Sequence, residues 1–208
     1  MVNIGVLVSG GGTNLQKLLD AQAAGEIENG SIRVVIASKP GVYALERAAR
    51  AGVEAVTLAR KEFPDVETYS RALIDELQKR DIGLVVLAGF LTITSEEFVR
   101  AFENRIINVH PALLPSFGGK GYYGLHVHEA ALARGVKVTG ATVHFVTEEC
   151  DGGPIILQQA VPVEEGDTPE VLQRRVMEQA EWKLLPRAVS LFCQGKLEVV
   201  NGVVRIRS

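Results

Sequence analysis

The first half of the chain alternates short apolar runs with amphipathic stretches, and this alternation restricts the fold more than any other feature. The apolar runs are rich in valine, isoleucine and leucine on both faces, as strands are in a parallel sheet covered by helices. They lie at Val2–Val8, Ile32–Ala37, Ala55–Leu58 and Leu84–Ala88. The stretches between them have helical periodicity and lie at Asn14–Ala24, Tyr43–Ala51 and Val66–Arg80. This order predicts an α/β fold, doubly wound around a mostly parallel sheet, with a Rossmann-like N-terminal half.

The second half has a different pattern. Three further strands are predicted, at Arg105–Val109, Val136–Val146 and Ile155–Val163. A long helical stretch, Thr168–Gln194, is expected to be kinked or divided at Pro186. The tail predicts a hairpin closed by Asn201-Gly202. Since no linker divides the chain, we expect one domain of residues 1–208 with two lobes, residues 1–107 and 108–208.

Charge and hydropathy exclude several classes of function. The net charge of −3 argues against a general nucleic-acid binder, which needs a basic surface to neutralise phosphates. No apolar run is long enough to cross a bilayer, so no membrane partner is expected. The N-terminus lacks the features of a secretory signal, and a cytoplasmic location is expected by default.

A glycine-rich turn, Ser9–Asn14, follows the first strand and opens the first helix. Glycines let backbone N–H groups approach a ligand closely, and a helix N-terminus attracts anions. Gly12, Thr13 and Asn14 are therefore candidate phosphate ligands. The spacing fits neither the dinucleotide fingerprint nor the nucleotide triphosphatase loop. A tight turn capped by Thr13 or Asn14 explains the motif equally well.

A second candidate site lies at the end of a later strand. Asn108 and His110 are two residues apart, so they project from the same face of the strand. An amide that steadies an oxyanion, beside an imidazole that moves a proton, suits acyl transfer. Asp151, in a predicted turn, would raise the pKa of His110 if the two meet. The alternatives are a structural pair at a strand end and a plain turn.

Three other histidines are weaker candidates. His126 and His128 are spaced as no helix-based zinc motif, and no cluster of further ligands stands out, so no metal is predicted. His144 lies within a predicted strand, and a satisfied core histidine is the expected interpretation.

Several motifs occur in an order that is far more specific than any one of them. They are Ser9–Gln16 (SGGGTNLQ), Leu87–Phe90 (LAGF), Asn108–Pro115 (NVHPALLP), Gly140–Val146 (GATVHFV), Asp151–Pro154 (DGGP) and Gly166–Thr168 (GDT). From Met1 to about Phe192 the chain closely resembles the phosphoribosylglycinamide formyltransferase family. The resemblance implies formyl transfer from 10-formyltetrahydrofolate, a co-substrate, to the glycine amine of glycinamide ribonucleotide in purine synthesis, without a metal.

The resemblance also implies roles for particular residues. Gly12, Thr13 and Asn14 match the loop that holds the ribonucleotide phosphate, and Glu181 matches an acidic residue near that substrate. The catalytic residues are Asn108, His110 and Asp151, and the folate ring lies against Asn108 and the loop Leu91, Thr92, Ile93 and Thr94. Phosphate binding falls to residues 1–107, and catalysis and folate binding to residues 108–208.

The implied mechanism is a direct attack of the substrate amine on the formyl carbon. Asn108 and a protonated His110 would stabilise the tetrahedral intermediate, and Asp151 would keep His110 protonated by raising its pKa.

The chain departs from the family at three places. Members often have Met-Arg-Ile-Leu where this chain has Leu91–Thr94, so Thr92 replaces an arginine. Val66 replaces a second arginine, which affects one expected contact to the folate tail. The segment Gly118–Gly124 is longer than in many relatives, and its Lys120 is expected to be a solvated loop lysine.

Three alternatives remain open. Methionyl-tRNA formyltransferase shares the catalytic residues but normally carries a C-terminal domain for tRNA. Formyltetrahydrofolate hydrolase usually has an N-terminal regulatory domain, and we expect neither additional domain here. A non-catalytic sensor of a phosphorylated ligand would need only the turn at Gly12. The expected partners are the two small substrates, and the sequence allows a monomer or a homodimer.

Overall fold

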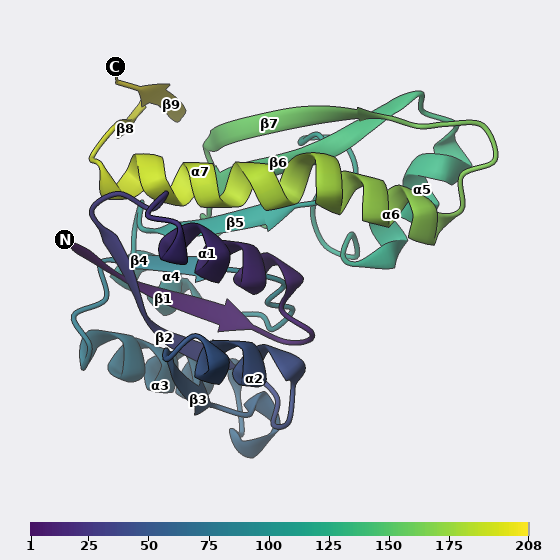
Figure 1. The fold of residues 1–208 in the computed structure, drawn as a ribbon. Helices are drawn as coiled ribbons and strands as arrows, with labels where there is room; N and C mark the ends of the chain where they lie inside the picture. Colours follow the sequence, from purple (N-terminus) through teal and green to yellow (C-terminus); the bar gives the residue numbers. More distant parts are fainter. Residues whose placement is uncertain (208) are drawn as a thin grey trace.

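A computed structural model describes residues 1–207, in which one seven-stranded sheet runs through the molecule (Figure 1). The strand order is β3-β2-β1-β4-β5-β6-β7. The strands are β1 (Val2–Val8), β2 (Gly30–Ala37), β3 (Glu54–Thr57), β4 (Leu84–Leu87), β5 (Ile106–His110), β6 (Val138–Phe145) and β7 (Ile155–Pro162). The first five strands in this order are parallel, and β6 and β7 are each antiparallel to their neighbour. The predicted doubly wound, mostly parallel α/β fold is confirmed.

Helices cover both faces of the sheet because the strands bury apolar side chains on both. In β1, Val6 and Val8 pack into one core cluster with the helices α1, α2, α6 and α7, while Leu7 packs into the other with α3 and α4. A fully buried aliphatic side chain contributes about 1.5–3 kcal/mol, so both layers are strongly stabilised. The helices are α1 (Thr13–Ala23), α2 (Tyr43–Arg50), α3 (Val66–Gln78), α4 (Glu96–Ala101), α5 (Leu125–Arg134), α6 (Pro169–Val176) and α7 (Trp182–Cys193).

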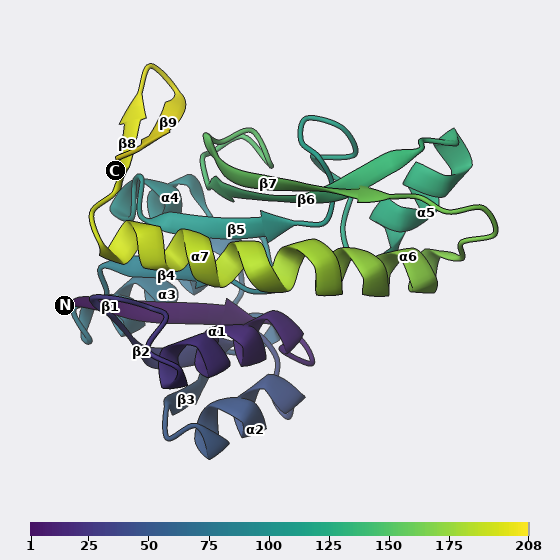
Figure 2. The ribbon, with the colours of Figure 1, turned by 45° about the horizontal axis from the view of Figure 1, so that its top comes forward.

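The long C-terminal helix is not divided at Pro186, so the predicted division is wrong. Pro186 lies inside α7, whose buried face packs on the core and holds the helix together despite the missing hydrogen bond. The irregularity lies earlier, in the π-helical turn Met177–Glu181 that joins α6 to α7. Figure 2 shows the two helices as one continuous rod across the sheet.

The ends of the predicted elements agree with the structure to within about two residues, and the structure adds three elements, α4, α5 and a 3₁₀ turn. The pattern did not predict α4, which begins after Ser95, whose hydroxyl accepts a hydrogen bond from the Phe98 N–H. A 3₁₀ turn, η1 (Arg60–Glu62), follows β3. The predicted hairpin is confirmed as β8 (Leu197–Val200) and β9 (Val203–Ile206).

The topology gathers the functional candidates at one edge of the sheet. The loops after β1, β2 and β4 leave from the carboxyl ends of parallel strands. The carboxyl end of β5, which carries Asn108 and His110, lies at the same edge. The expected lobe boundary, between residues 107 and 108, falls inside β5, so the sheet continues across it. No helix in residues 1–207 is long and apolar enough to span a membrane.

Candidate active site

The pair predicted on β5 is joined by a histidine from the neighbouring strand. Asn108 stands opposite His144 of β6 in the antiparallel register, and the Asn108 Nδ2 lies 3.2 Å from the His144 Nε2. The His144 Nδ1 donates to the carbonyl oxygen of Phe145 at 2.8 Å. In the neutral ring the Nε2 therefore accepts from Asn108. This bond uses one N–H of the Asn108 amide and leaves the other free to donate.

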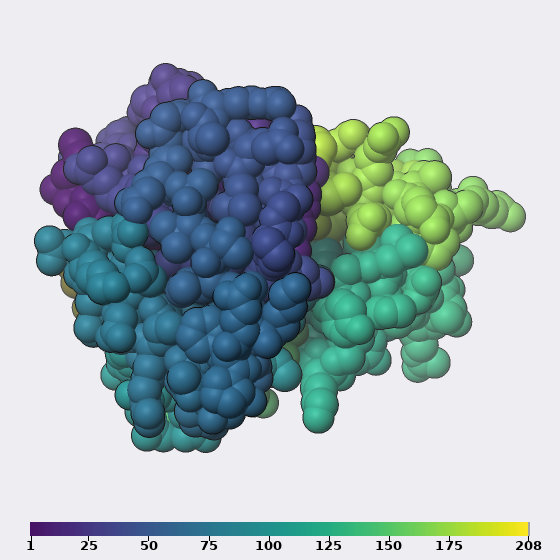
Figure 3. All heavy atoms as spheres, turned by 90° about the horizontal axis from the view of Figure 1, so that it is seen from below, coloured from purple at the N-terminus to yellow at the C-terminus, as the bar shows by residue number. Residues whose placement is uncertain are grey.

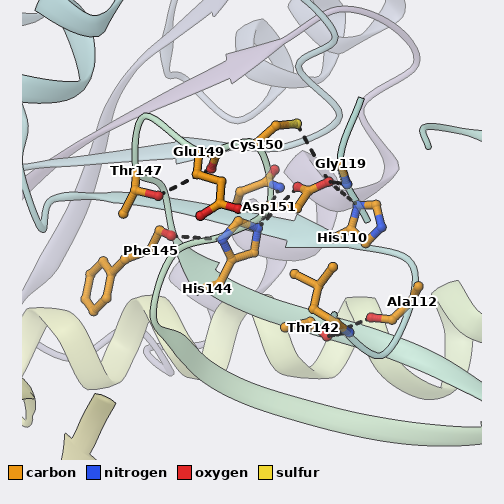
Figure 4. Close-up of polar contacts among 12 residues, drawn as sticks. His110, Ala112, Gly119, Thr142, His144, Phe145, Thr147, Glu149, Cys150 and Asp151 are labelled. Atoms are coloured by element: carbon orange, nitrogen blue, oxygen red, sulfur yellow. Dashed lines mark hydrogen bonds and ion pairs between the residues drawn. The ribbon is translucent and has the colours of Figure 1, made fainter. Parts of the chain in front are cut away.

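Asp151, in the loop between β6 and β7, lies between two imidazoles (Figure 4). Its Oδ2 is 3.5 Å from the His110 Nδ1, and its Oδ1 is 3.6 Å from the His144 Nε2. The Gly119 N–H donates to Oδ2 at 2.8 Å. Burial acts to raise the pKa of Asp151, but the histidines and this N–H outweigh it and leave the pKa below its ordinary value. The structure therefore brings together the three residues predicted as catalytic, with Asp151 as an anion.

The pKa of His110 corrects one prediction. Asp151 and the carbonyl of Phe117 do act to raise it, as expected for Asp151. Burial acts in the opposite direction and is the largest effect, because only 4% of the residue is exposed. The predicted effect of Asp151 is thus present, but burial outweighs it and leaves the pKa of His110 below the usual value for histidine.

A glycine-rich segment covers His110. The His110 Nε2 donates to the carbonyl oxygen of Phe117 at 2.7 Å. Gly118 packs so tightly against Leu114 that a Cβ atom would lie 2.4 Å from the leucine side chain. Both ring nitrogens of His110 thus face acceptors, Phe117 on one side and Asp151 on the other. A protonated ring has an N–H on each nitrogen, so it could interact favourably with both acceptors.

The predicted phosphate loop forms a second polar cluster with the C-terminal helix. Gly12 precedes α1 with a φ of 73°, and a Cβ atom there would lie 2.8 Å from the Ala44 Cβ. The first N–H groups of α1 have no partner within the helix and no side-chain cap. The side chains of Thr13 and Asn14 turn instead towards the π-helical turn, where Thr13 lies 3.9 Å from the Met177 sulfur.

Asn14 and Glu181 form the buried part of this second cluster. The Asn14 Nδ2 donates to Glu181 at 2.8 Å, and the two residues are 9% and 6% exposed. The Asn14 Oδ1 has no hydrogen-bond partner among residues 1–207. Burial raises the pKa of Glu181 to about 7, although the hydrogen bond from Asn14 acts in the opposite direction. The cluster therefore offers backbone N–H donors beside oxygen acceptors.

The predicted folate loop follows β4 and lies next to β5, the strand that carries Asn108. Leu91 and Ile93 are 59% and 73% exposed, which leaves apolar side chains uncovered, while Thr92 and Thr94 are half-buried. The Leu91 N–H donates to the Ser9 hydroxyl at 3.0 Å, which ties this loop to the glycine-rich turn. Viewed from below, the molecule has a recess between its N-terminal half and the later segments (Figure 3).

The remaining candidates lie outside these clusters. Lys120 is exposed and forms no salt bridge within residues 1–207. His126 pairs with Glu129 on the surface, and His128 is buried with neither ring nitrogen hydrogen-bonded to any other described residue. The part of the chain that the structure describes contains no group of three or more His, Cys, Asp or Glu residues arranged for a metal.

Two members of the catalytic cluster were missed by sequence reasoning. His144 is buried and hydrogen-bonded, as predicted for a core histidine, but it also contacts the candidate catalytic residues. Two features of the sequence could have identified His144 as a site residue: its place in the motif Gly140–Val146 and the two-residue periodicity of its strand. The carbonyl of Phe117 is a backbone group, so no side-chain pattern could have identified it.

Comparisons with known proteins agree with this architecture. The model of the formyl transferase family matches residues 2–189. The chain is 43% identical over 198 residues to phosphoribosylglycinamide formyltransferase of Escherichia coli, covering 95% of this chain and 90% of that protein. The crystal structure of glycinamide ribonucleotide transformylase 1 from Symbiobacterium toebii superposes with a TM-score of 0.94 at 46% identity, covering 100% of this chain and 95% of that one. The chain therefore belongs to the formyl transferase family, and the assignment made from its motifs is confirmed.

One rival shares the fold. A formyltetrahydrofolate deformylase from Pseudomonas syringae superposes with a TM-score of 0.88 at 24% identity, and the chain covers 66% of its length. At that identity the likeness extends to the fold alone.

Proposed function

We propose that this chain transfers the formyl group of 10-formyltetrahydrofolate to the glycine amine of glycinamide ribonucleotide in purine synthesis. One observation carries the proposal. Asn108, His110 and Asp151, three residues with the chemistry of acyl transfer, meet at one end of β5. They do so in a chain that is 43% identical to a relative named for this transfer.

Each substrate has its own cluster in this proposal. The N–H groups at Gly12, Thr13 and Asn14 bind the ribonucleotide phosphate, because a helix N-terminus favours an anion. Glu181, with the free Oδ1 of Asn14, accepts hydrogen bonds from ribose hydroxyl groups.

The pterin ring of the folate lies against Leu91–Thr94 and Asn108, where exposed apolar side chains offer it a surface. Residues 1–107 thus hold the phosphate and, through this loop, part of the folate. Residues 108–208 supply the catalytic side chains, and the two lobes form one domain.

Asn108 and His110 act on the reacting atoms. The free N–H of Asn108 donates to the formyl oxygen, which gains negative charge when the amine attacks. His144 holds the Asn108 amide in this orientation by accepting its other N–H. Fixed donors of this kind lower the barrier because they need no reorganisation during the reaction.

His110 moves the proton. Its lowered pKa keeps the imidazole neutral near neutral pH, so it can accept the proton that the attacking amine loses. The imidazolium that forms is stabilised by Asp151 at 3.5 Å. The same proton then passes to the folate nitrogen as the C–N bond to the formyl group breaks. No covalent bond to the enzyme is needed.

For this to occur, the Phe117 carbonyl must leave the His110 Nε2, whose N–H donates to it at 2.7 Å. The ring proton must also move to the Nδ1, which faces Asp151 at 3.5 Å, so that the Nε2 has a free electron pair for the proton of the amine. The segment that carries it contains four glycines, Gly118, Gly119, Gly121 and Gly124, three of them with positive φ. Arrival of substrate at the recess would replace this backbone contact with one to the reacting atoms.

A single assay tests the proposed function. The protein is incubated with 10-formyltetrahydrofolate in the presence and absence of glycinamide ribonucleotide, and the release of tetrahydrofolate is followed. Release that requires the ribonucleotide is expected. Release without it would instead indicate a hydrolase, and no release in either case would favour a non-catalytic sensor.

A further inference from the structure

An arginine from the second helix contacts the glycine-rich turn Ser9–Asn14. Arg47 is the fifth residue of α2, and its Nε donates to the carbonyl oxygen of Gly11 at 2.8 Å. Its Nη1 donates to the Oε1 of Gln16, in the first turn of α1, at 2.9 Å. The guanidinium lies over the ring of Tyr43, 4.7 Å from its centre. Three contacts therefore fix the position of this one cation beside the turn.

The start of α2 makes a second hydrogen bond to the same turn. The backbone N–H of Ala44 donates to the carbonyl oxygen of Gly10 at 3.3 Å. Ala44 is fully buried, and a Cβ atom added at Gly12 would lie 2.8 Å from the Ala44 Cβ. Helix α2 therefore holds one side of the turn in direct contact, with no room for a side chain between them.

These two hydrogen bonds determine where the N–H groups of the turn point. A trans peptide unit is planar, so its C=O and N–H bonds point in nearly opposite directions. Since the carbonyl groups of Gly10 and Gly11 are directed at donors of α2, the N–H groups of Gly11 and Gly12 are directed away from that helix. Within residues 1–207 neither of these N–H groups donates a hydrogen bond. They are therefore donors of fixed direction that a ligand can use.

The contact from Arg47 also strengthens one of these donors. The carbonyl of Gly11 and the N–H of Gly12 belong to the same peptide unit. A cation that donates to the carbonyl oxygen polarises this unit, and hydrogen bonds linked in a chain strengthen one another by roughly 10–30% per bond. The Gly12 N–H should therefore bind an anion more tightly with Arg47 in place than without it.

The charge of Arg47 is not neutralised by a carboxylate of the described chain. Arg50, one turn further along α2, pairs with Glu46 at 3.3 Å, whereas Arg47 forms no salt bridge within residues 1–207. Its contacts are to a carbonyl oxygen, an amide oxygen and an aromatic ring, all of them uncharged. A half-buried charge is screened less by salt than an exposed one. Arg47 therefore adds a positive potential to that of the α1 N-terminus.

We propose that Arg47 is a positioning residue for the phosphate of the ribonucleotide. It acts from behind the turn, where it directs and polarises the Gly12 N–H and supplies an unpaired positive charge. The proposal rests on the proposed function, in which Gly12, Thr13 and Asn14 bind this phosphate. Arg47 belongs to α2, whereas the candidate catalytic side chains come from β5, β6 and the loop after β6. Loss of Arg47 should therefore weaken binding of one substrate and leave the chemical step intact.

Steady-state kinetics of two variants test this proposal. In Arg47→Ala the KM of the ribonucleotide should rise about tenfold, as expected for the loss of one hydrogen bond from a charged group. The kcat and the KM of the folate should stay nearly unchanged. Arg47→Lys keeps the charge and one donor but not the planar fork that reaches Gly11 and Gln16 together, so its KM should lie between the two. Thermal unfolding checks that both variants are folded.

Two probes separate the phosphate from the rest of the ribonucleotide. Inorganic phosphate should compete with the ribonucleotide, and its inhibition constant should rise in Arg47→Ala by about the same factor as the KM. Glycinamide riboside, which lacks the phosphate, should be a poor substrate for both proteins, and Arg47→Ala should leave its kcat/KM unchanged. A merely structural role for Arg47 would lower the activity with the riboside as well.

The matched control is Arg50→Ala. It removes the same charge from the same helix and from the same ring, since Arg50 lies 5.5 Å from the centre of the Tyr43 ring, but Arg50 makes no hydrogen bond to the turn within residues 1–207. Both KM values should stay unchanged. An unchanged ribonucleotide KM in Arg47→Ala, an equal rise in Arg50→Ala, or a loss shared by the riboside would overturn the proposal. Failure of the proposed function looks different, since the unaltered protein would then show no ribonucleotide-dependent turnover.

Discussion

The two polar clusters at the carboxyl edge of the sheet are constructed in different ways. The candidate catalytic cluster consists of side chains from β5, β6 and the following loop, and the partly buried Asp151 lies between two histidines. The phosphate cluster consists mainly of backbone N–H groups at the start of α1, with Glu181 behind them. In the proposed function, chemistry in the first cluster depends on charge and protons, whereas phosphate binding in the second depends on backbone shape. Substitutions should therefore separate kcat effects from KM effects.

The largest effect is expected at the catalytic cluster. Asn108→Ala and His110→Ala each remove a group that we propose acts on the reacting atoms, and loss of one oxyanion donor costs on the order of a hundredfold or more in rate. We expect kcat to fall by at least that much and the KM values to change little. His126→Ala, which alters a surface histidine paired with Glu129, serves as the control. A matching fall in substrate affinity would indicate a binding role instead.

Asp151→Asn should have the next largest effect. It keeps the shape of the side chain but removes the charge that raises the pKa of His110 against the effect of burial. The pKa of His110 should fall further, and kcat should fall roughly tenfold or more because the imidazolium loses its partner. NMR titration of the His110 ring across acidic to neutral pH measures the first effect. Normal activity together with an unmoved titration would contradict the mechanism.

In the phosphate cluster, Gly12→Val should raise the KM of the ribonucleotide by about tenfold or more and leave the KM of the folate nearly unchanged. The new side chain would collide with Ala44 and distort the loop, at positive φ. Gly25→Val is a matched control, because Gly25 has a φ of 75° with nothing within 4 Å of the added Cβ. Backbone strain of about 1–3 kcal/mol is common to both. An unchanged ribonucleotide affinity in folded Gly12→Val would show that the phosphate binds elsewhere.

The smallest expected effect is a pH-dependent change in the stability of the protein when Glu181 is replaced. Its pKa in the folded protein, about 7, is above that of the unfolded chain, so its contribution to stability is intact at low pH and is lost as pH rises towards 7. Glu181→Gln keeps an oxygen to accept from Asn14 and cannot ionise. The variant should be more stable than the unaltered protein at pH 8, by on the order of 1–3 kcal/mol. The difference should vanish near pH 4. Thermal unfolding of both proteins at several pH values measures this difference in stability. A difference that does not change with pH would rule out ionisation of Glu181 as its cause.

The sequence by itself determined the fold class and the order of most elements. Strand and helix periods are local properties, so runs such as Val2–Val8 and Leu84–Ala88 predicted strands to within a residue. The two-residue period also placed Asn108 and His110 on one face of β5. Helix α4 was missed because six residues give too short a period to recognise, and helix α5 was missed as well. Pro186 was misjudged because packing of α7 on the core outweighs one lost hydrogen bond.

Only the tertiary structure decided what surrounds each site residue. The partner of Asn14 is 167 positions away, and that of Asn108 is 36 positions away. Such distances depend on how the sheet brings separate segments together, which no local pattern encodes. The pKa of His110 shows the physical reason most clearly. The sequence identified the charge that raises it, but burial, a property of the whole fold, has the larger effect and lowers it.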